Sequence, residues 1–224
     1  MSRFADQKGF DLIAEKAHEL MREDLVLVVL GSGERKYEDL FRALAAAYPG
    51  RVGVKIAYDN LLAHKVEAGA DLFLMPSRYE PSGLNQMYSL KYGTVPIVRA
   101  TGGLDDSIEP FDVEHGTGTG FKFKEYTGEA LLFAIRQALH HYMDERIWKH
   151  IQLNGMAKDF SWKTPAAEYA KLYEAARVPR GLSSQAQSSG KAAPGAGQAG
   201  RGAGQSAQAA GQATRNQKPA GTSN

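Results

Sequence analysis

Short apolar runs constrain the fold of this chain more strongly than any other feature of its sequence. The clearest is residues 25–30, which contain only Leu and Val and end at Gly31. A strand that is apolar on both faces is typical of a parallel sheet that helices cover on both sides. Further β-rich runs occur at 52–57, 71–75, 95–98 and 120–123.

Amphipathic stretches separate these runs and predict helices at 9–22, 34–48, 61–68, from about 84, and at 127–141, 144–157 and 164–176. Strands that alternate with helices predict an α/β fold with a doubly wound, Rossmann-like parallel sheet. In that fold the first strand is central in the sheet. No apolar run precedes the first predicted helix, so we expect the sheet to lack this strand between runs 25–30 and 71–75. We also expect the chain to be incomplete at its N-terminus.

Composition divides the chain into two parts. Residues 182–224 are almost all Ala, Gly, Gln and Ser, with one large apolar residue and no aromatic. They cannot bury enough surface to offset the entropy of ordering, so we expect a disordered tail after a single domain at 1–181. The net charge is +2, but the tail holds four basic residues and no acid, which leaves −2 for residues 1–181. This mildly acidic domain does not favour a nucleic-acid partner.

The chain contains no cysteine, which excludes disulfides and thiolate metal sites. No apolar run reaches the length that a membrane span needs, and residues 1–7 do not have the pattern of a signal peptide. We therefore expect a cytoplasmic protein with no membrane partner.

A carboxylate and small residues follow run 71–75, in a loop that leads into the next predicted helix. Open α/β sheets bind ligands at the carboxyl ends of their strands, so Glu80, Ser82 and Gly83 are candidate ligand contacts. Glu80 has two interpretations. It accepts hydrogen bonds from a bound sugar, or it is a solvated acid near the start of a helix. Spacing alone does not choose between them.

A glycine pair, Gly102 and Gly103, follows run 95–98. Successive backbone N–H groups without a Cβ suit a phosphate. An ordinary tight turn is the alternative, and by itself it is the commoner case. The Gly31–Gly33 turn is a weaker phosphate signal, because it lacks the third glycine of the dinucleotide fingerprint.

Two cations and one aromatic residue lie near the same predicted sheet edge. Arg3 and Lys8 either reach a diphosphate or form a flexible basic terminus. Tyr58 follows run 52–57 and either stacks on a base or is a half-buried aromatic. The six histidines lack metal-ligand spacing, so we expect no metal site.

Together these segments resemble the C-terminal domain of bacterial glycogen synthases and plant starch synthases. Residues 2–13 are similar to the family's Ser-Arg-Leu-x-x-Gln-Lys-Gly-x-Asp-Leu segment. Residues 76–88 resemble its Pro-Ser-Arg-Phe-Glu-Pro-Cys-Gly-Leu-x-Gln-x-Tyr segment. Residues 91–104 continue the match, and 160–162 resemble the start of the family's closing helix. The resemblance covers about residues 1–178.

The resemblance implies the C-terminal half of a two-domain GT-B enzyme with no cofactor beyond its substrates. Such an enzyme transfers glucose from ADP-glucose to the non-reducing end of an α-1,4-glucan, with retention. By this resemblance Arg3 and Lys8 would bind the diphosphate and stabilise the leaving ADP, and Glu80 would face the sugar. Tyr58 would stack on adenine. The other implied contacts to the phosphate and glucosyl groups are Ser82, Gly83, Leu84, Asn85, Thr101, Gly102 and Gly103.

The chain departs from the family pattern at two positions. Ser82 stands where the family often has Cys. Tyr88 stands where related retaining enzymes carry a second Glu, which favours the glycogen and starch synthases. The family's N-terminal domain, which supplies much of the acceptor site, has no counterpart in these residues. We therefore expect that domain as a partner and expect this chain alone to be inactive. Two alternatives stay open: another retaining enzyme that uses a nucleotide-glucose donor, and a non-catalytic nucleotide-binding fragment.

Overall fold

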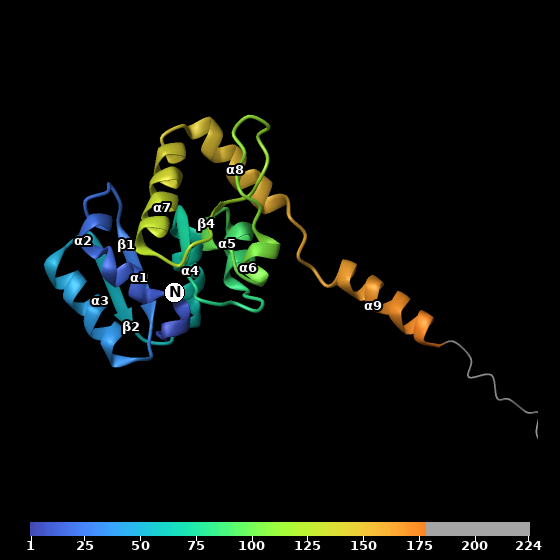
Figure 1. Cartoon of the computed structure of the whole chain (residues 1–224), viewed down its shortest axis with the longest axis horizontal. Coiled ribbons are helices and arrows are strands. Elements are labelled where there is room, and N and C mark those ends of the chain that lie inside the picture. Colours follow the sequence, from blue (N-terminus) through green and yellow to red (C-terminus); the bar gives the residue numbers. More distant parts are fainter. Residues whose placement is uncertain (178–224) are drawn as a thin grey trace, which may run out of the picture. The chain divides into compact units, whose positions relative to one another are not determined.

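Two parallel sheets carry the fold in the computed structural model, which describes residues 1–177 (Figure 1). Strand β1 (Leu27–Gly31) pairs with β2 (Val52–Ile56). The second sheet has the order β3-β4-β5, formed by Leu72–Met75, Val95–Arg99 and Phe121–Phe123. The parallel pairing confirms the predicted α/β class. The predicted tail at 182–224 lies outside the described residues.

Helices connect the strands, as the alternating pattern predicts. They are the 3₁₀ helix η1 (Asp6–Lys8), then α1 (Phe10–Glu15), α2 (Ala17–Leu20), α3 (Arg35–Ala47), α4 (Asn60–Gly69), α5 (Asn85–Tyr92), α6 (Gly103–Ser107), α7 (Gly128–Tyr142), α8 (Glu145–Ala157) and α9 (Lys163–Ala176). Helix α7 packs against β4 and β5 and also against α1. This packing links the two sheets, which share no backbone pairing. None of the helices in the described part is long and apolar enough to cross a membrane.

One local prediction differs from the structure. The stretch predicted as one helix at 9–22 is broken at Lys16, whose backbone leaves the helical region. Helix α4 is capped by Asp59. The Asp59 carboxylate accepts a hydrogen bond from the N–H of Leu62, so it satisfies a donor that the first turn leaves free.

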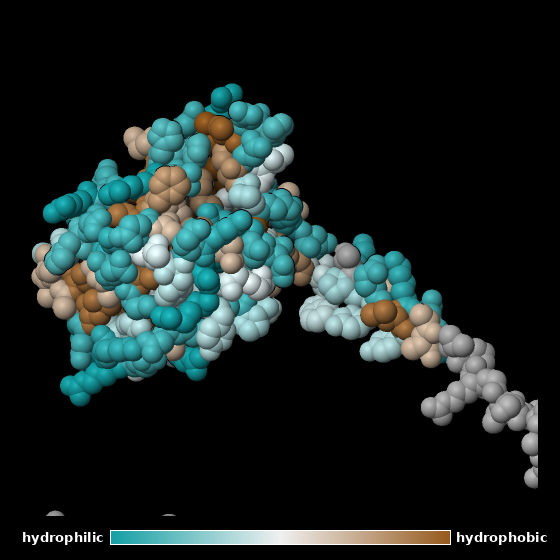
Figure 2. Space-filling view, in the orientation of Figure 1, coloured by the Kyte–Doolittle hydropathy of each residue, from teal (hydrophilic) through white to brown (hydrophobic). Residues whose placement is uncertain are grey.

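The core is centred on three aromatic side chains from segments far apart in sequence. The Phe4 ring lies 5.2 Å from both Phe10 and Phe41, and Phe41 is fully buried. The same cluster of buried residues continues through Val95 and Ile97 of β4, so one core supports both sheets. On the face drawn in Figure 2, the surface is mostly hydrophilic with scattered apolar side chains.

The two sheets differ from the predicted single doubly wound sheet in one respect. The described residues place no strand between β1 and β3, so the two sheets stay separate. Residues 1–4 instead run parallel to the end of β1. Ser2 donates its N–H to the carbonyl of Leu30 at 3.1 Å, and Phe4 forms a parallel bridge with Gly33. This pairing holds the first loop at the carboxyl edge of the strands.

Candidate functional site

Three loops meet at the carboxyl ends of the strands. The first follows residues 1–4, the second follows β3, and the third follows β4. The N–H of Arg78 in the second loop donates to the carbonyl of Gln7 in the first, at 2.8 Å. The N–H of Gly103 in the third donates to the carbonyl of Glu80 in the second, at 3.0 Å. Backbone hydrogen bonds therefore join the segments that the sequence singles out.

Glycine permits this close approach. A Cβ on Gly9 would lie 1.9 Å from the carbonyl oxygen of Pro76, and one on Gly103 would lie 2.0 Å from that of Ser82. Gly9 also has φ +74°, in the left-handed region that favours glycine. The glycine pair Gly102 and Gly103, predicted to bind a phosphate, thus has a packing role. The Gly103 N–H is already bonded within the protein, so it does not point freely at a ligand.

Lys8 and Glu80 form an ion pair at the junction of these loops. The Nζ of Lys8 lies 2.5 Å from Oε2 of Glu80, and Ser77 donates its hydroxyl to the same oxygen at 3.4 Å. The side chains of Lys8 and Glu80 are 22% and 10% exposed. A carboxylate this buried needs a compensating charge. Lys8 supplies this charge. Two of the predicted site residues are therefore in direct contact.

Side chains that were not predicted from the sequence bind the backbone of the loop that contains Glu80. Arg99, at the end of β4, donates to the carbonyls of Ser77 at 3.3 Å and Arg78 at 2.6 Å. The guanidinium groups of Arg78 and Arg99 both lie over the ring of Tyr126. Tyr126 donates its hydroxyl to Asp11 at 2.5 Å. Burial and this hydrogen bond raise the pKa of Tyr126 to about 12, so the hydroxyl remains a donor at neutral pH.

A second missed residue, Gln86, holds the next turn of the same loop. Its fully buried amide donates to the carbonyls of Ser82 and Gly83, each at 3.1 Å, and to the Ser107 hydroxyl. Ser82 itself is exposed, and Leu84 is half exposed. The available sequence signal was a polar residue in the first turn of a predicted helix, directly after the candidate loop.

Other predicted residues line a neighbouring hollow of about 580 Å³. Arg3, Tyr58 and Asn85 contribute to its wall, together with His64 and Tyr88. Arg3 is exposed and makes no salt bridge to any described residue. Tyr58 is 89% exposed, so its ring is not buried in the core. The amide of Asn85 donates to the carbonyl of Met1 at 3.4 Å.

The predicted residues therefore fall into two adjoining groups. Lys8, Glu80, Gly102 and Gly103 meet where the loops join, and Arg3, Tyr58 and Asn85 surround the hollow. His64 also belongs to the hollow, and its ring centroid lies 6.3 Å from that of Tyr88. Within residues 1–177, no three potential His, Asp or Glu ligands gather as a metal site would require.

Comparison with known proteins places this arrangement in context. Residues 1–151 match the family model described as glycosyl transferases group 1. The chain is 60% identical over 180 residues to a glycogen synthase of Koribacter versatilis (strain Ellin345), and 51% identical over 179 residues to one of Anaeromyxobacter sp. (strain Fw109-5). Each match covers 80% of this chain, but only 37% and 38% of the relatives. The chain thus spans little more than a third of their length.

A solved structure agrees with these relatives. The catalytic domain of Starch Synthase IV from Arabidopsis thaliana, bound to ADP and acarbose, superimposes with a TM-score of 0.71 and is 32% identical. The match covers 78% of this chain and 37% of that one. The sequence resemblance to glycogen and starch synthases is confirmed.

Proposed function

Because the chain belongs to the glycosyl transferases of group 1, we propose that it is the donor-binding part of a glycogen synthase. The proposed reaction transfers glucose from ADP-glucose to the non-reducing end of an α-1,4-glucan, with retention. Its glycogen synthase relatives, and the solved starch synthase domain bound to ADP, support this choice of donor and acceptor.

The contact between Lys8 and Glu80 is the observation that carries the proposal. The Lys8 ammonium lies 2.5 Å from the Glu80 carboxylate, beside the glycine loop that follows β4. A cation binds phosphate oxygens, and a carboxylate accepts hydrogen bonds from sugar hydroxyls. A sugar joined to a diphosphate presents both groups within one molecule. This pair of side chains therefore suits a nucleotide-sugar.

The chemistry required of these residues is stabilisation of the leaving group. Breaking the bond between the glucosyl carbon and phosphate develops negative charge on ADP, which fixed cations in a closed site oppose. Arg3 makes no salt bridge to a described residue, so it is available to the diphosphate without breaking an ion pair. Lys8 is paired and has to exchange Glu80 for phosphate, which frees the Glu80 carboxylate for the glucosyl hydroxyls.

The hollow beside Arg3 suits the nucleoside part of the donor. Tyr58 offers an exposed ring at its wall, and a base that stacks on the ring covers apolar surface on both partners. We assign adenine to this position. The acceptor glucan would lie against polypeptide that the relatives contain and these residues do not match, since the chain covers only 37% of the first relative.

Calorimetry of ADP binding to this chain tests the proposal. The Lys8→Ala variant should bind ADP about 1.5–3 kcal/mol more weakly, because it loses a hydrogen bond to a charged group. Lys149→Ala is the matched control, since Lys149 is an exposed lysine on α8 away from the loops. Unchanged ADP affinity in the Lys8 variant would remove Lys8 from the site.

Competition between donors separates the proposed function from the nearest alternative. ADP-glucose should displace ADP more effectively than UDP-glucose does. Tighter binding of UDP-glucose would instead favour another retaining nucleotide-glucose enzyme. If neither donor binds, the protein shares the fold of the family but lacks a nucleotide-sugar site.

A further inference from the structure

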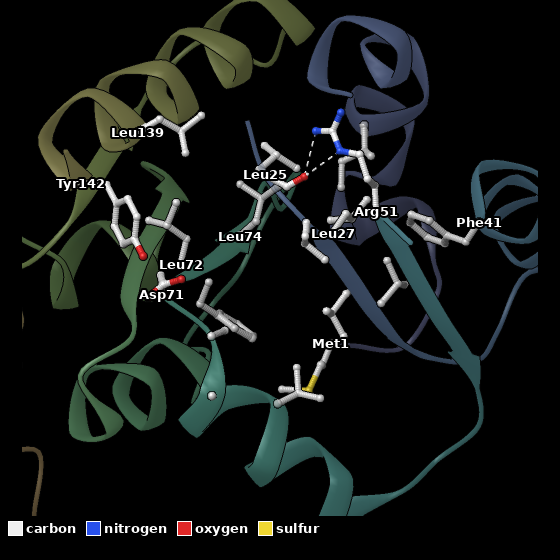
Figure 3. A pocket seen from close by; sticks show the side chains of 18 of the residues that line it. Met1, Leu25, Leu27, Phe41, Arg51, Asp71, Leu72, Leu74, Leu139 and Tyr142 are labelled. Carbon is white, nitrogen blue, oxygen red and sulfur yellow. Dashed lines mark hydrogen bonds between the residues drawn. The ribbon is translucent and has the colours of Figure 1, made fainter. Parts of the chain in front are cut away.

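Two hollows of different character lie beside the strands. A cavity of about 790 Å³ lies between the facing edges of β1 and β3 (Figure 3), and its apolar lining includes Leu25, Leu27, Leu72 and Leu74. In a doubly wound sheet the first strand occupies this position, so the fold itself accounts for this cavity. The hollow of about 580 Å³ beside Arg3 is different, because charged and polar side chains line it.

One face of α4 forms a wall of this polar hollow. The residues that contribute are spaced three and four apart along the helix: Asn60, Ala63, His64 and Glu67. Tyr58 lies just before the helix and lines the same hollow. Side chains on a helix lean toward its N-terminus, so the Glu67 carboxylate leans along the wall in the direction of Tyr58.

Two carboxylates contribute to the wall, and their surroundings differ. Oδ1 of Asp59 accepts the N–H of Leu62 at 2.9 Å, and Oδ2 pairs with Nζ of Lys55 at 2.8 Å. Both oxygens of Asp59 are therefore engaged. No described residue donates a hydrogen bond to the carboxylate of Glu67. Of the two, Glu67 is the carboxylate that can accept hydrogen bonds from a ligand without losing any.

Glu67 is buried although it has no hydrogen-bond donor within the described chain. The residue is 3% exposed. Nδ1 of His64 lies 3.9 Å away, beyond hydrogen-bond distance, and contacts the Tyr92 hydroxyl at 3.1 Å instead. The α-amino group of Met1 acts on the carboxylate through space only. Burial raises the pKa of the Glu67 carboxyl above its usual value, so the protein's own groups do not offset the cost of the buried charge.

We propose that Glu67 binds the two ribose hydroxyls of the donor nucleotide and makes the hollow selective for ribonucleotides over deoxyribonucleotides. A carboxylate offers two acceptor oxygens, and ribose presents two neighbouring hydroxyl donors. A carboxylate binds a ribose hydroxyl in other doubly wound folds as well. The inference rests on the proposed function, because it assumes that the hollow holds the nucleoside of the donor.

The covalent order of the donor agrees with this position. Ribose joins the base to the diphosphate, so it lies between the groups that bind these two parts. Tyr58 and Arg3, which we assign to the base and the diphosphate, line the same hollow as Glu67. The volume of about 580 Å³ also falls within the range of small-molecule pockets, about 300–1,000 Å³. A nucleoside bound between Tyr58 and Arg3 therefore presents its ribose to the wall that carries Glu67.

Calorimetry with ADP, 2′-deoxy-ADP and 3′-deoxy-ADP tests the proposal on the whole 224-residue chain. At pH 8 the Met1 amino group, with a pKa of about 6, is largely neutral and does not compete for Glu67. Each deoxynucleotide should bind at least about tenfold more weakly than ADP, because it loses a hydrogen bond to a charged group.

Variants show whether this preference comes from the Glu67 carboxylate. In Glu67→Leu the three nucleotides should bind equally, because an apolar side chain accepts no hydrogen bond. Glu67→Gln keeps one acceptor oxygen without the charge and should retain part of the preference. Asp59→Asn is the matched control. It removes the charge of the other carboxylate in the wall but keeps an oxygen that caps α4, so the full preference should remain.

The preference is a ratio of two affinities in one protein sample. A variant that is only partly folded still reports it, because both affinities fall by the same factor. Equal binding of the three nucleotides to the unchanged chain, a full preference in Glu67→Leu, or its loss in Asp59→Asn would overturn the inference. In each of these cases, ADP binding that still depends on Lys8 would leave the proposed function intact. Absence of ADP binding would overturn both.

Discussion

Glu80 and Lys8 show what a single side chain does at this site. Each is 72 residues from the other in sequence, yet their charged groups are in contact. Glu80 is 8% exposed as a whole residue, so its carboxylate depends on Lys8 and on the Ser77 hydroxyl. Any ligand that binds the Lys8 ammonium group therefore also changes the surroundings of the Glu80 carboxylate.

This coupling predicts different effects of Glu80→Gln on two ligands. The affinity for ADP-glucose should fall by about 1.5–3 kcal/mol, because the charged acceptor for a sugar hydroxyl is lost. The affinity for ADP should stay constant or rise, because Lys8 no longer has an ionic partner to give up. Calorimetry with both ligands measures this split, with Glu145→Gln on α8 as an exposed control. Equal losses for both ligands would point to a general folding role.

The α-amino group of Met1 predicts a pH dependence of stability. Burial lowers its pKa to about 6 from the usual 8.0, although the nearby Glu67 carboxylate acts in the opposite direction. The unfolded chain therefore binds more protons than the folded chain between these values, and stability should rise from pH 6 to pH 8. Urea denaturation across this range measures the slope. The slope should decrease when the amino group is acetylated, and an unchanged slope would contradict the assignment.

At the scale of elements, the site depends on loops that approach each other closely, not on any one helix or strand. The loops are held in contact by Gly9 against Pro76, by Gly103 against Ser82, and by the Arg99 guanidinium. Only the last of these contacts involves a long side chain. Backbone geometry therefore sets the position of Glu80.

Substitution of Gly9 tests this dependence. Gly9→Ala places a methyl group 1.9 Å from the carbonyl oxygen of Pro76 and forces φ +74° on a residue with a side chain. The backbone conformation alone should cost about 1–2 kcal/mol, and the clash adds to it. Gly53→Ala is the control, because nothing lies within 4 Å of its added Cβ. Urea denaturation of both variants measures the difference, and similar stabilities would argue against tight loop packing.

At the scale of the whole molecule, side-chain packing joins what the sheets leave separate. The aromatic cluster of Phe4, Phe10 and Phe41 shares a core with β4, and α1 packs on α7. Among residues 1–177, no strand pairs with the facing edges of β1 and β3, and open edges of this kind promote association with other chains. The proposed donor site lies on one side of these sheets, at the carboxyl ends of the strands.

We predict that the 224-residue chain does not synthesise glucan by itself. Positioning of two substrates supplies much of the rate in a transfer reaction, and these residues are proposed to bind only the donor. Incubation with labelled ADP-glucose and glycogen should give no more incorporation than a Glu80→Ala control. Incorporation clearly above that control would show that the chain binds the acceptor as well.

The sequence by itself determined the class of fold, and it predicted where the site lies. Apolar runs and amphipathic stretches are local patterns, so they predict strands and helices without knowledge of their partners. The loops at 76–88 and 101–104 were recognisable because they follow such runs and resemble a known family. The family match confirms that resemblance, while the roles of the individual residues remain predictions.

The tertiary structure alone decided which groups meet. The ion pair of Lys8 with Glu80, the support from Arg99 and Tyr126, and the buried amide of Gln86 all join residues through long-range packing or precise geometry. The sequence predicted a gap in the sheet, but not the apolar cavity between β1 and β3. Contacts between distant segments depend on how the whole chain packs, and no local pattern of residues encodes them.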